Sequence, residues 1–270
     1  MNRKIIYLLN PISGTGKKDR LRQLVEAKTQ ANQIPYVFLQ TDPEGKYLAA
    51  RDLIETENYT DVVAMGGDGT VRAVVHALRD TGVRFGILPI GSGNGLARSA
   101  QIPMRLKSAL QLVFEGHAKP IDAFWVNDQF SCMLSGLGFD AQVAYEFAQK
   151  QGRGLLTYTQ QSIIQFFKAI PHQFEVVLPG FRFFTDAFFI SVANSNQFGN
   201  NATIAPVASL TDGLLDVVIV QKMSKAKLPF AVWRQMRGNN QLQELVAEHS
   251  NKNILYFQTP SLEIRNPKLA

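Results

Sequence analysis

The 270-residue sequence predicts an α/β protein in two parts: an N-terminal α/β domain with a parallel sheet over residues 1–122, and a C-terminal antiparallel β-sandwich domain over residues 123–270. Two observations predict this division. In the first part, short apolar runs alternate with helical stretches, which is typical of a parallel sheet with right-handed crossovers. In the second part, alternating phenylalanine-rich runs are separated by turn dipeptides, which is typical of antiparallel strands. The length suffices for two domains that each bury a core.

The first strand is expected over Ile5–Leu9, a short aliphatic and β-branched run. It ends at Asn10-Pro11-Ile12-Ser13-Gly14, a polar loop that precedes a helical pattern from Asp19 to Ala31. This loop resembles a Walker A loop only superficially, because the Gly-x-x-x-x-Gly-Lys-Ser/Thr spacing is absent. The next expected elements are a strand over Tyr36–Gln40 that ends at Thr41 and a helix over Tyr47–Thr56.

The third strand, Val62–Met65, leads directly into the glycine-rich turn Gly66-Gly67-Asp68-Gly69-Thr70, and a helical stretch from Val71 to Arg79 follows. The glycines allow the backbone to take positive φ and to come close to a ligand, and N–H groups at a helix N-terminus suit a phosphate. Asp68 is unusual there, because a carboxylate repels phosphate unless a cation lies between them or the carboxylate handles a proton. We interpret Asp68 as a Mg²⁺-organising or proton-handling residue of a nucleotide site. A plain β-turn with an Asx hydrogen bond is the alternative.

The fourth strand, Phe85–Ile90, ends at a second glycine-rich loop, Gly91-Ser92-Gly93-Asn94-Gly95, and a helix is expected to start at Leu96-Ala97-Arg98. Loops that follow parallel strands gather at the carboxyl edge of the sheet, where open α/β sheets bind ligands. Three polar loops at one such edge predict a phosphate site more strongly than one glycine turn does.

The second part is rich in phenylalanine from Ala123 onward, with turns at Pro179-Gly180 and Asp212-Gly213. Most of the phenylalanines are explained by a sandwich core, and a few would line an apolar slot for an acyl or sphingoid chain; periodicity does not separate the two. The expected strands are Phe174–Leu178, Arg182–Ala193, Leu214–Gln221, Ile254–Gln258 and Leu262–Ile264, and the expected helices are Gly152–Ile170 and Gln241–His249.

Composition narrows the class of protein. No apolar run approaches the ~20 residues that a transmembrane helix needs, and the first apolar run is too short for a signal peptide, so a cytoplasmic location is expected. One cysteine excludes an internal disulfide, and four scattered histidines without a second thiol exclude a familiar zinc site, which leaves hard metals bound by oxygen. The net charge of +6 indicates an anionic partner, which could be a nucleotide, a nucleic acid or an anionic membrane surface. The basic residues are dispersed apart from the run Lys17–Arg22, so a dedicated nucleic-acid stripe is not evident.

Three segments of the first part resemble the diacylglycerol kinase catalytic-domain family, which includes bacterial lipid kinases, sphingosine kinases and ceramide kinases. The glycine turn is shared with NAD kinases, whereas the other two segments favour lipid kinases. The segments are Asn10-Pro11 with Ser13-Gly14, Gly66–Thr70, and Leu88–Asn94 with Leu96–Arg98. The second part is similar to the family's second domain at Leu134–Ala141, Val192–Ser195, Phe198–Asn200, Ile204–Ala208 and Asp212–Asp216.

The resemblance implies an NAD kinase/diacylglycerol kinase-like fold and an ATP-dependent lipid kinase. Such an enzyme transfers the γ-phosphate of ATP to the hydroxyl of diacylglycerol or of a sphingoid or ceramide-like lipid. It implies ATP and Mg²⁺ as cofactors, a lipid with a free hydroxyl as substrate, and peripheral contact with the membrane surface. A homodimer is left open.

The resemblance also assigns residues by position. Asp68 and Asp216 are the catalytic candidates, since in some family members the second position joins the first in a water-mediated Mg²⁺ network. In bacterial members a nearby loop holds a structural Mg²⁺, which here implies the Asp212 side chain and the carbonyls of Ser209 and Leu214. Apart from the resemblance, Arg98 and Lys17 are candidates by their charge to neutralise phosphate, with a solvated surface cation as the alternative for each. The expected nucleotide contacts are Asn10, Thr41, Gly66, Gly67, Asp68, Gly69, Thr70, Val71, Arg72, Ser92 and Asn94.

The sequence departs from the family pattern at two points. Bacterial lipid kinases take their base from a glutamate in an Asp-Gly-Glu segment that would begin where this sequence ends, so we expect the native chain to continue, with a non-catalytic relative as the alternative. Sphingosine kinases assign the base role to the aspartate of the glycine turn, here Asp68. Asn94-Gly95 is nearer the sphingosine and ceramide kinase pattern than the Asn-Asp of many bacterial enzymes. An NAD kinase is the second enzyme to test, although its downstream Asn-Glu motif is missing.

Overall fold

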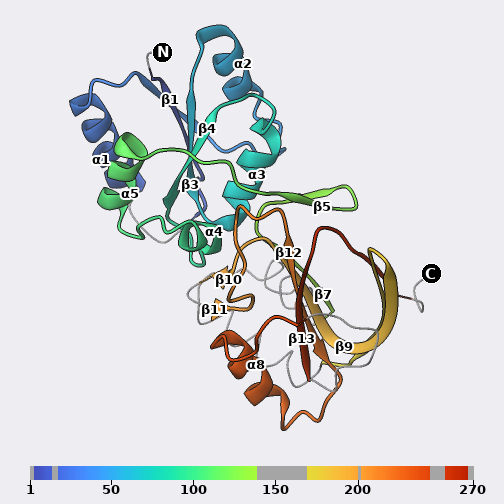
Figure 1. Ribbon diagram of the computed structural model, residues 1–270. Coiled ribbons are helices and arrows are strands. Elements are labelled where there is room, and N and C mark those ends of the chain that lie inside the picture. The colour runs from blue at the N-terminus through green and yellow to red at the C-terminus, as the bar shows by residue number, and fades with distance from the viewer. Residues whose placement is uncertain (1–2, 14–17, 139–168, 200–201, 244–252, 267–270) are drawn as a thin grey trace. The chain divides into compact units, whose positions relative to one another are not determined.

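The computed structural model describes residues 3–13, 18–138, 169–199, 202–243 and 253–266 (Figure 1). The chain divides into two compact units, residues 1–120 (unit 1) and 121–270 (unit 2), and each is described by itself. Within the described ranges, every helix is too short or too polar to cross a bilayer.

Unit 1 is built on a four-stranded parallel sheet in the order β2-β1-β3-β4 (Figure 1). The two central strands are almost entirely apolar and buried, as expected when helices cover both faces of a parallel sheet. The register places Leu9 beside Gln40 and Met65, and Gly66 beside Pro89, so the four strands end level with one another. The strands are β1 (Ile5–Leu9), β2 (Tyr36–Gln40), β3 (Asp61–Gly66) and β4 (Arg84–Pro89).

Helices cover both faces of this sheet, with α1 and α5 on one side and α2 and α3 on the other (Figure 1). On the first side, Tyr7 and Met65 of the sheet pack with Val25 of α1 and Leu110 of α5. The Tyr7 hydroxyl is satisfied inside this core by Thr29 Oγ1 at 2.8 Å. The helices are α1 (Lys18–Ala31), α2 (Leu48–Glu57), α3 (Asp68–Leu78), α4 (Gly95–Ser99) and α5 (Leu106–Glu115).

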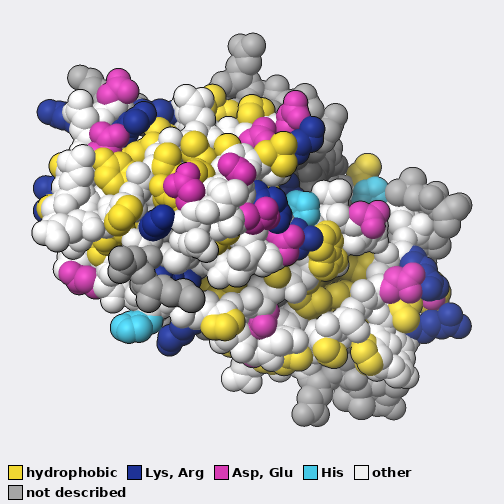
Figure 2. Space-filling view, turned by 90° about the horizontal axis from the view of Figure 1, so that it is seen from above, with side chains coloured by type: hydrophobic (Ala, Val, Ile, Leu, Met, Phe, Trp, Pro, Cys, Tyr) yellow, Lys and Arg dark blue, Asp and Glu magenta, His cyan; other side chains and the backbone are white. Residues whose placement is uncertain are grey.

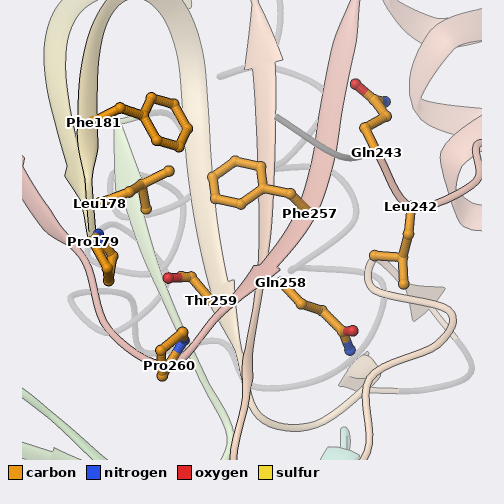
Figure 3. A pocket seen from close by; sticks show the side chains of 9 residues that line it. All are labelled: Leu178, Pro179, Phe181, Leu242, Gln243, Phe257, Gln258, Thr259 and Pro260. Atoms are coloured by element: carbon orange, nitrogen blue, oxygen red, sulfur yellow. The ribbon is translucent and has the colours of Figure 1, made fainter. Parts of the chain in front are cut away.

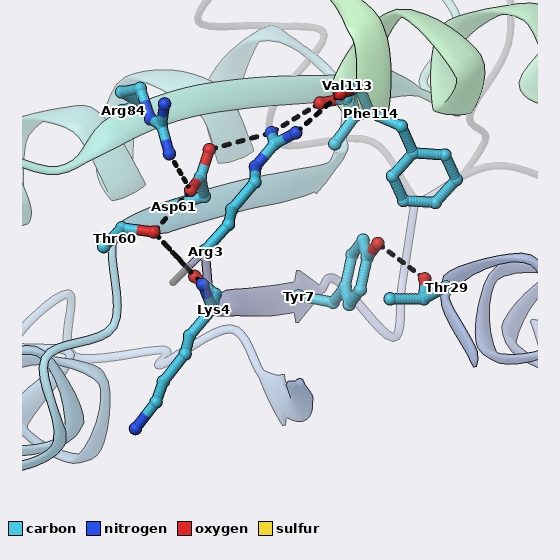
Figure 4. A network of polar contacts seen from close by, with 9 residues as sticks. All are labelled: Arg3, Lys4, Tyr7, Thr29, Thr60, Asp61, Arg84, Val113 and Phe114. Atoms are coloured by element: carbon cyan, nitrogen blue, oxygen red, sulfur yellow. Dashed lines mark hydrogen bonds and ion pairs between the residues drawn. The ribbon is translucent and has the colours of Figure 1, made fainter. Parts of the chain in front are cut away.

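A buried carboxylate links the strands at the amino edge of the sheet (Figure 4). Asp61, whose side chain is 4% exposed, accepts from Arg3 at 2.9 Å and from Arg84 at 2.7 Å. Arg3 also donates to the carbonyl oxygens of Val113 and Phe114, at 2.5 and 2.9 Å. Because the last carbonyls of a helix lack partners, the Arg3 guanidinium both pairs with the carboxylate and caps α5. This ionic network therefore lies at the opposite end of the strands from the polar loops.

Unit 2 is built on a six-stranded antiparallel sheet around β9, which is 13 residues long. The first half of β9 alternates between partly buried and exposed side chains, and the stretch Ala187–Ala193 is buried throughout. The second half is therefore covered on both faces. The strands of this sheet are β7 (Leu134–Gly138), β8 (His172–Leu178), β9 (Phe181–Ala193), β12 (Leu215–Gln221), β13 (Ile254–Thr259) and β14 (Glu263–Arg265). Two short hairpins accompany it: β5 (Phe124–Val126) with β6 (Gln129–Ser131), and β10 (Gln197–Gly199) with β11 (Ala202–Thr203).

The two faces of this sheet bury separate cores, because successive side chains of a strand point to opposite faces. On one face, Val218 and Tyr256 pack with Leu228 of helix α8 (Leu228–Met236). On the other face, Val217 and Phe257 pack with further apolar residues of the sheet. The expected combination of a parallel α/β domain with an antiparallel β domain is confirmed.

Two local expectations are wrong, and one helix was not predicted. Helix α3 begins at Asp68 rather than at Val71, so the glycine turn forms its first turn. Helix α8 has no counterpart among the predicted elements. Gln241–Gln243 was expected to open a helix, but the Gln243 N–H donates to Tyr256 O at 2.8 Å and the segment runs beside β13. The expected helix Gly152–Ile170 lies almost wholly outside the described residues, as do residues 244–249, Lys17, Phe139–Ala141 and Asn200.

Candidate functional site

The predicted loops lie at the topological switch point of the parallel sheet. In the order β2-β1-β3-β4, the chain passes from β1 outward to β2 and from β3 outward to β4, so the two connections run in opposite directions along the sheet. Ligands of open α/β sheets bind at the carboxyl ends of the strands where this reversal occurs. The loop from Asn10 and the glycine turn from Gly66 follow these two strands, so the structure brings them together as the sequence predicts.

A side-chain hydrogen bond joins these two loops. Asn10 Nδ2 donates to Thr70 Oγ1 at 2.7 Å, and Thr70 is only 7% exposed. Asn10 Oδ1 accepts from the Ile12 N–H at 3.0 Å. Both polar ends of the Asn10 side chain thus shape the site itself, and its contact with a nucleotide stays a prediction.

The glycine turn presents backbone N–H groups at the start of α3. Gly67 precedes the helix, and the Val71 N–H is bonded to Gly67 O at 3.0 Å. The N–H groups of Asp68, Gly69 and Thr70 therefore precede the first intrahelical hydrogen bond and have no acceptor within the helix. Gly69 is exposed, and an added Cβ there would meet no atom within 4 Å, so this first turn is open to a ligand.

Of the two properties that these glycines allow, the turn uses close approach and not positive φ. Gly66, Gly67 and Gly69 are absent from the positive-φ glycines of the described chain, and Gly67 has φ −99°. Close approach requires a glycine at positions 66 and 91, whereas Gly69 has open space around it. A Cβ on Gly66 would lie 2.4 Å from the Thr70 side chain, and a Cβ on Gly91 would lie 2.4 Å from Gly67 Cα. The turn after β3 and the loop after β4 are thus packed backbone against backbone.

Asn94 closes the loop after β4. It adopts φ 54°, its Oδ1 accepts from the Gly91 N–H at 3.1 Å, and its Nδ2 donates to Gly91 O at 2.8 Å. Asn94 is 8% exposed, whereas Ser92 is exposed at the tip of the loop. Of the two, Ser92 is the side chain that remains accessible to a ligand.

Asp68 joins the glycine turn to this second loop. Its side chain is half-buried, and Oδ1 accepts from the Leu96 N–H at 3.2 Å. A carboxylate at the first position of α3, hydrogen-bonded to the first turn of α4, is stabilised by both sets of backbone N–H groups. The Asx-turn alternative is therefore not what is observed, because the partner is 28 residues away.

The remaining nucleotide candidates surround this point or lie beside it. The Thr41 N–H donates to Leu9 O at 3.0 Å, which places Thr41 level with Asn10 at the same sheet edge. The next residue, Asp42, accepts from three N–H groups, and the one from Tyr47 does most to hold the pKa of Asp42 below its ordinary value. Arg72 is exposed on α3, and Arg98 Nε donates to Gly93 O at 3.3 Å.

Unit 2 holds the second catalytic candidate in a different setting. Asp216 is fully buried; its Oδ1 accepts from the Tyr256 hydroxyl at 2.6 Å and its Oδ2 from Gln258 Nε2 at 3.1 Å. Burial raises the pKa of Asp216, while these two hydrogen bonds lower it by less. Burial likewise raises the pKa of Tyr256, and the Asp216 hydrogen bond adds to that shift. Sequence reasoning missed both partners, because the strand register that places Gln258 directly opposite Asp216 is visible only in the structure.

The predicted metal loop lies just before this residue. Asp212 is exposed, its Oδ1 accepts from the Leu214 N–H at 3.1 Å, and the Gly213 N–H donates to Asp122 Oδ2 at 2.7 Å. Among the described residues, no three His, Cys, Asp or Glu side chains converge as a metal cage. One carboxylate with carbonyl oxygens of Ser209 and Leu214 still fits a hard cation that completes its shell with water.

A cavity of about 620 Å³ lies in unit 2 (Figure 3). Phe181 and Phe257 point toward one another across it, and Gln258, a partner of Asp216, lies on its wall. Two phenylalanines therefore line a space that the core does not fill. The lining residues are Leu178, Pro179, Phe181, Leu242, Gln243, Phe257, Gln258, Thr259 and Pro260.

Surface charge does not form a nucleic-acid stripe on the face shown in Figure 2. Lys and Arg side chains alternate there with Asp and Glu side chains and with apolar ones. A stripe of one sign would be expected for a backbone-tracking nucleic-acid site.

Two family models match the chain in succession. Residues 4–126 match the diacylglycerol kinase catalytic domain, and residues 134–254 match the YegS C-terminal NAD kinase beta sandwich-like domain. Among solved structures, a diacylglycerol kinase from Bacillus anthracis superposes with a TM-score of 0.73 and 18% identity over 98% of this chain and 86% of that one. The fold is therefore that of the two-domain kinases.

Proteins of similar sequence show the family to which the chain belongs. A "Probable lipid kinase YegS-like" protein of Pectobacterium atrosepticum is 33% identical over 77% of this chain and 68% of its own length. The diacylglycerol kinase of Bacillus subtilis is 29% identical over 97% of this chain and 84% of its own length. The chain belongs to the diacylglycerol kinase catalytic-domain family.

Proposed function

We propose that this chain is an ATP-dependent lipid kinase that transfers the γ-phosphate of ATP to the hydroxyl of diacylglycerol or of a sphingoid or ceramide-like lipid. The observation that carries the proposal is the carboxyl edge of unit 1, where the open first turn of α3 and the Asp68 carboxylate stand at the switch point. A helix N-terminus of this kind suits phosphate oxygens. Membership of a kinase family supports ATP as the phosphate donor.

Phosphoryl transfer depends on positioning and on neutralising charge. In the proposed site, the backbone of residues 66–72 cradles the phosphates, to which the N–H groups of residues 68–70 donate, and Asn10, Thr41, Ser92 and Asn94 lie around the nucleotide. Mg²⁺, when bound, supplies positive charge to the phosphate oxygens. One half-buried carboxylate, Asp68, fits a cation held mainly by phosphate and water.

Two further roles belong to the proposal. Asp68 accepts the proton of the lipid hydroxyl if no glutamate supplies the base, and Asp216 acts as the second catalytic carboxylate. Asp212, with the carbonyls of Ser209 and Leu214, holds a structural Mg²⁺. Phe181 and Phe257 line the cavity of unit 2 that would take an acyl or sphingoid chain. The proposed location is the cytoplasm, with peripheral contact with the membrane and no nucleic acid as partner; a homodimer is a further partner to test.

The test is a transfer assay with the full gene product, Mg²⁺ and labelled ATP. Diacylglycerol, sphingosine and ceramide are presented separately in mixed micelles, and NAD is supplied in a parallel reaction. We expect label in one phospholipid product and none in NADP. Label in NADP would replace the proposal with an NAD kinase. ATP binding without any labelled product would indicate a non-catalytic relative.

A further inference from the structure

Helix α8 exposes aromatic side chains on the face turned away from its sheet. Leu228 and Gln235 are buried, whereas Phe230 is 65% and Trp233 is 51% exposed. Residues three and four apart share a face of a helix, so Leu228, Val232 and Gln235 define the packed face and Phe230 and Trp233 the opposite one. The outer face of a surface helix is ordinarily polar. The exposed aromatic side chains of α8 therefore suggest a surface that binds a partner.

The exposed aromatic residues form one continuous patch. The Phe230 and Trp233 rings stack with centroids 6.0 Å apart and planes 25° apart. Met236, 37% exposed, is one turn further along the helix. The Arg237 guanidinium lies 5.6 Å from the Trp233 ring centre, so a cation borders the patch. Single exposed apolar residues are common, but a stacked pair edged by a cation is characteristic of an interaction surface.

The segment around this helix is strongly basic. Residues 222–237 contain five Lys or Arg and no Asp or Glu, against a net charge of +6 for the whole chain. All five side chains are exposed. Asp186 lies 3.8 Å from Lys222 and offsets part of that charge. The five cations are Lys222, Lys225, Lys227, Arg234 and Arg237.

We propose that α8 and the preceding basic segment, residues 222–237, dock this protein on an anionic phospholipid bilayer. Tryptophan and phenylalanine partition into the headgroup region, while the cations meet lipid phosphates. A second copy of the chain is disfavoured, because a two-fold contact through this face would oppose like charges. The inference rests on the proposed function only in that a lipid substrate brings the enzyme to a bilayer.

The proposal predicts a dependence on lipid charge and on salt. Each Lys or Arg near an anionic surface strengthens binding by about fivefold. Salt shortens the Debye length from about 8 Å at physiological ionic strength to about 3 Å at 1 M, so binding weakens as salt is added. The aromatic pair contributes a part of the affinity that salt does not remove.

The first experiment uses tryptophan emission. The chain has two tryptophans, so Trp125→Phe leaves Trp233 as the sole probe. We expect a blue shift with vesicles of equal parts phosphatidylcholine and phosphatidylglycerol, and none with phosphatidylcholine alone. The matched variant Trp233→Phe retains Trp125, which is 52% exposed on β5, and its emission should not move. An unshifted Trp233, or an equal shift with uncharged vesicles, would overturn the proposal.

The second experiment measures sedimentation with the same vesicles in the absence of ATP. We expect the double variant Phe230→Ala with Trp233→Ala to bind about tenfold more weakly or worse. Phe184→Ala, at a site 59% exposed on β9, is the control and should bind normally. Unchanged binding of the double variant contradicts the proposal. Self-association of the unmodified chain that this variant abolishes without vesicles would assign the face to a second copy instead.

A final pair of assays separates docking from catalysis. Turnover is measured with a short-chain diacylglycerol dissolved as monomer and with long-chain diacylglycerol in the vesicles. We expect the double variant to lose the second activity and to retain the first. If the unmodified chain turns over neither lipid but binds vesicles through α8, the proposed function fails while the docking surface stands.

Discussion

The two units each hold a candidate carboxylate, and they support it in opposite ways. Asp68 is half-buried at the start of α3, just after a parallel strand, and is held by a backbone N–H from the first turn of α4. Asp216 is fully buried within an antiparallel sheet and is held by the Tyr256 and Gln258 side chains of the adjacent strand. A parallel sheet collects loop backbones at one edge, whereas an antiparallel sheet sets side chains opposite one another. The first arrangement leaves a charge open to a ligand; the second couples the charge to the stability of the fold.

The largest effect is expected for a substitution of Asp68, the carboxylate that is open to a ligand. In Asp68→Asn, the amide oxygen still accepts from the Leu96 N–H, so the melting temperature should change little. Kinase activity should fall about 100-fold or more, because the charge that we propose to organise the metal is lost. Asp52→Asn, an exposed position on α2, serves as the control. Equal turnover in Asp68→Asn and the unmodified chain would remove Asp68 from the mechanism.

The second test separates packing from ligand access at two glycines. In Gly91→Ala the new Cβ meets Gly67 Cα at 2.4 Å, so the free energy of unfolding should fall by about 1–3 kcal/mol. Gly69→Ala meets no atom within 4 Å and should keep its stability. It should nevertheless weaken ATP binding, since the methyl group occupies the approach to the turn. Thermal melts and ATP titration measure the two effects, and equal destabilisation by both changes would refute the packing argument.

The third test removes a hydrogen-bond partner of the buried carboxylate, Asp216. Tyr256→Phe leaves Asp216 Oδ1 and the Val207 N–H without the hydroxyl that each now contacts. The free energy of unfolding should fall by about 1–3 kcal/mol in urea titrations. Tyr36→Phe, whose hydroxyl makes an exposed contact with Gln30, should change stability by less than about 0.5 kcal/mol. Similar losses in the two variants would show that the Asp216 contact is not special.

The smallest expected effect concerns pH. The pKa of Asp216 is raised in the folded state above its ordinary value of 3.8, so the folded chain binds this proton more tightly than the unfolded chain. Asp216 therefore adds to the free energy of unfolding at low pH, and this stabilisation is lost as pH rises through the raised pKa. Asp216→Asn should flatten that part of the stability curve and leave stability at pH 7 equal or slightly higher, while lowering activity. An unaltered pH profile would contradict the raised pKa.

The sheet and its edge were predictable because each loop directly follows an apolar strand, as Asn10 follows Leu9 and Gly66 follows Met65. The contacts within the site were not. The Asp68 bond to Leu96 spans 28 residues and depends on the packing of two loops, which no local pattern encodes. Helix α8 was missed for a related reason: Phe230 and Trp233 on its outer face remove the apolar periodicity that marks a helix.

The packing of Gly67 against Gly91 has a consequence for motion. Because the two backbones meet without intervening side chains, and Asp68 is bonded to Leu96, neither loop can open alone. The hydrogen-bonded amides of Val71, Gly91 and Leu96 should then exchange hydrogen with solvent as one cooperative unit. An anion bound at the first turn of α3 should therefore also slow exchange at the Gly91 and Leu96 amides.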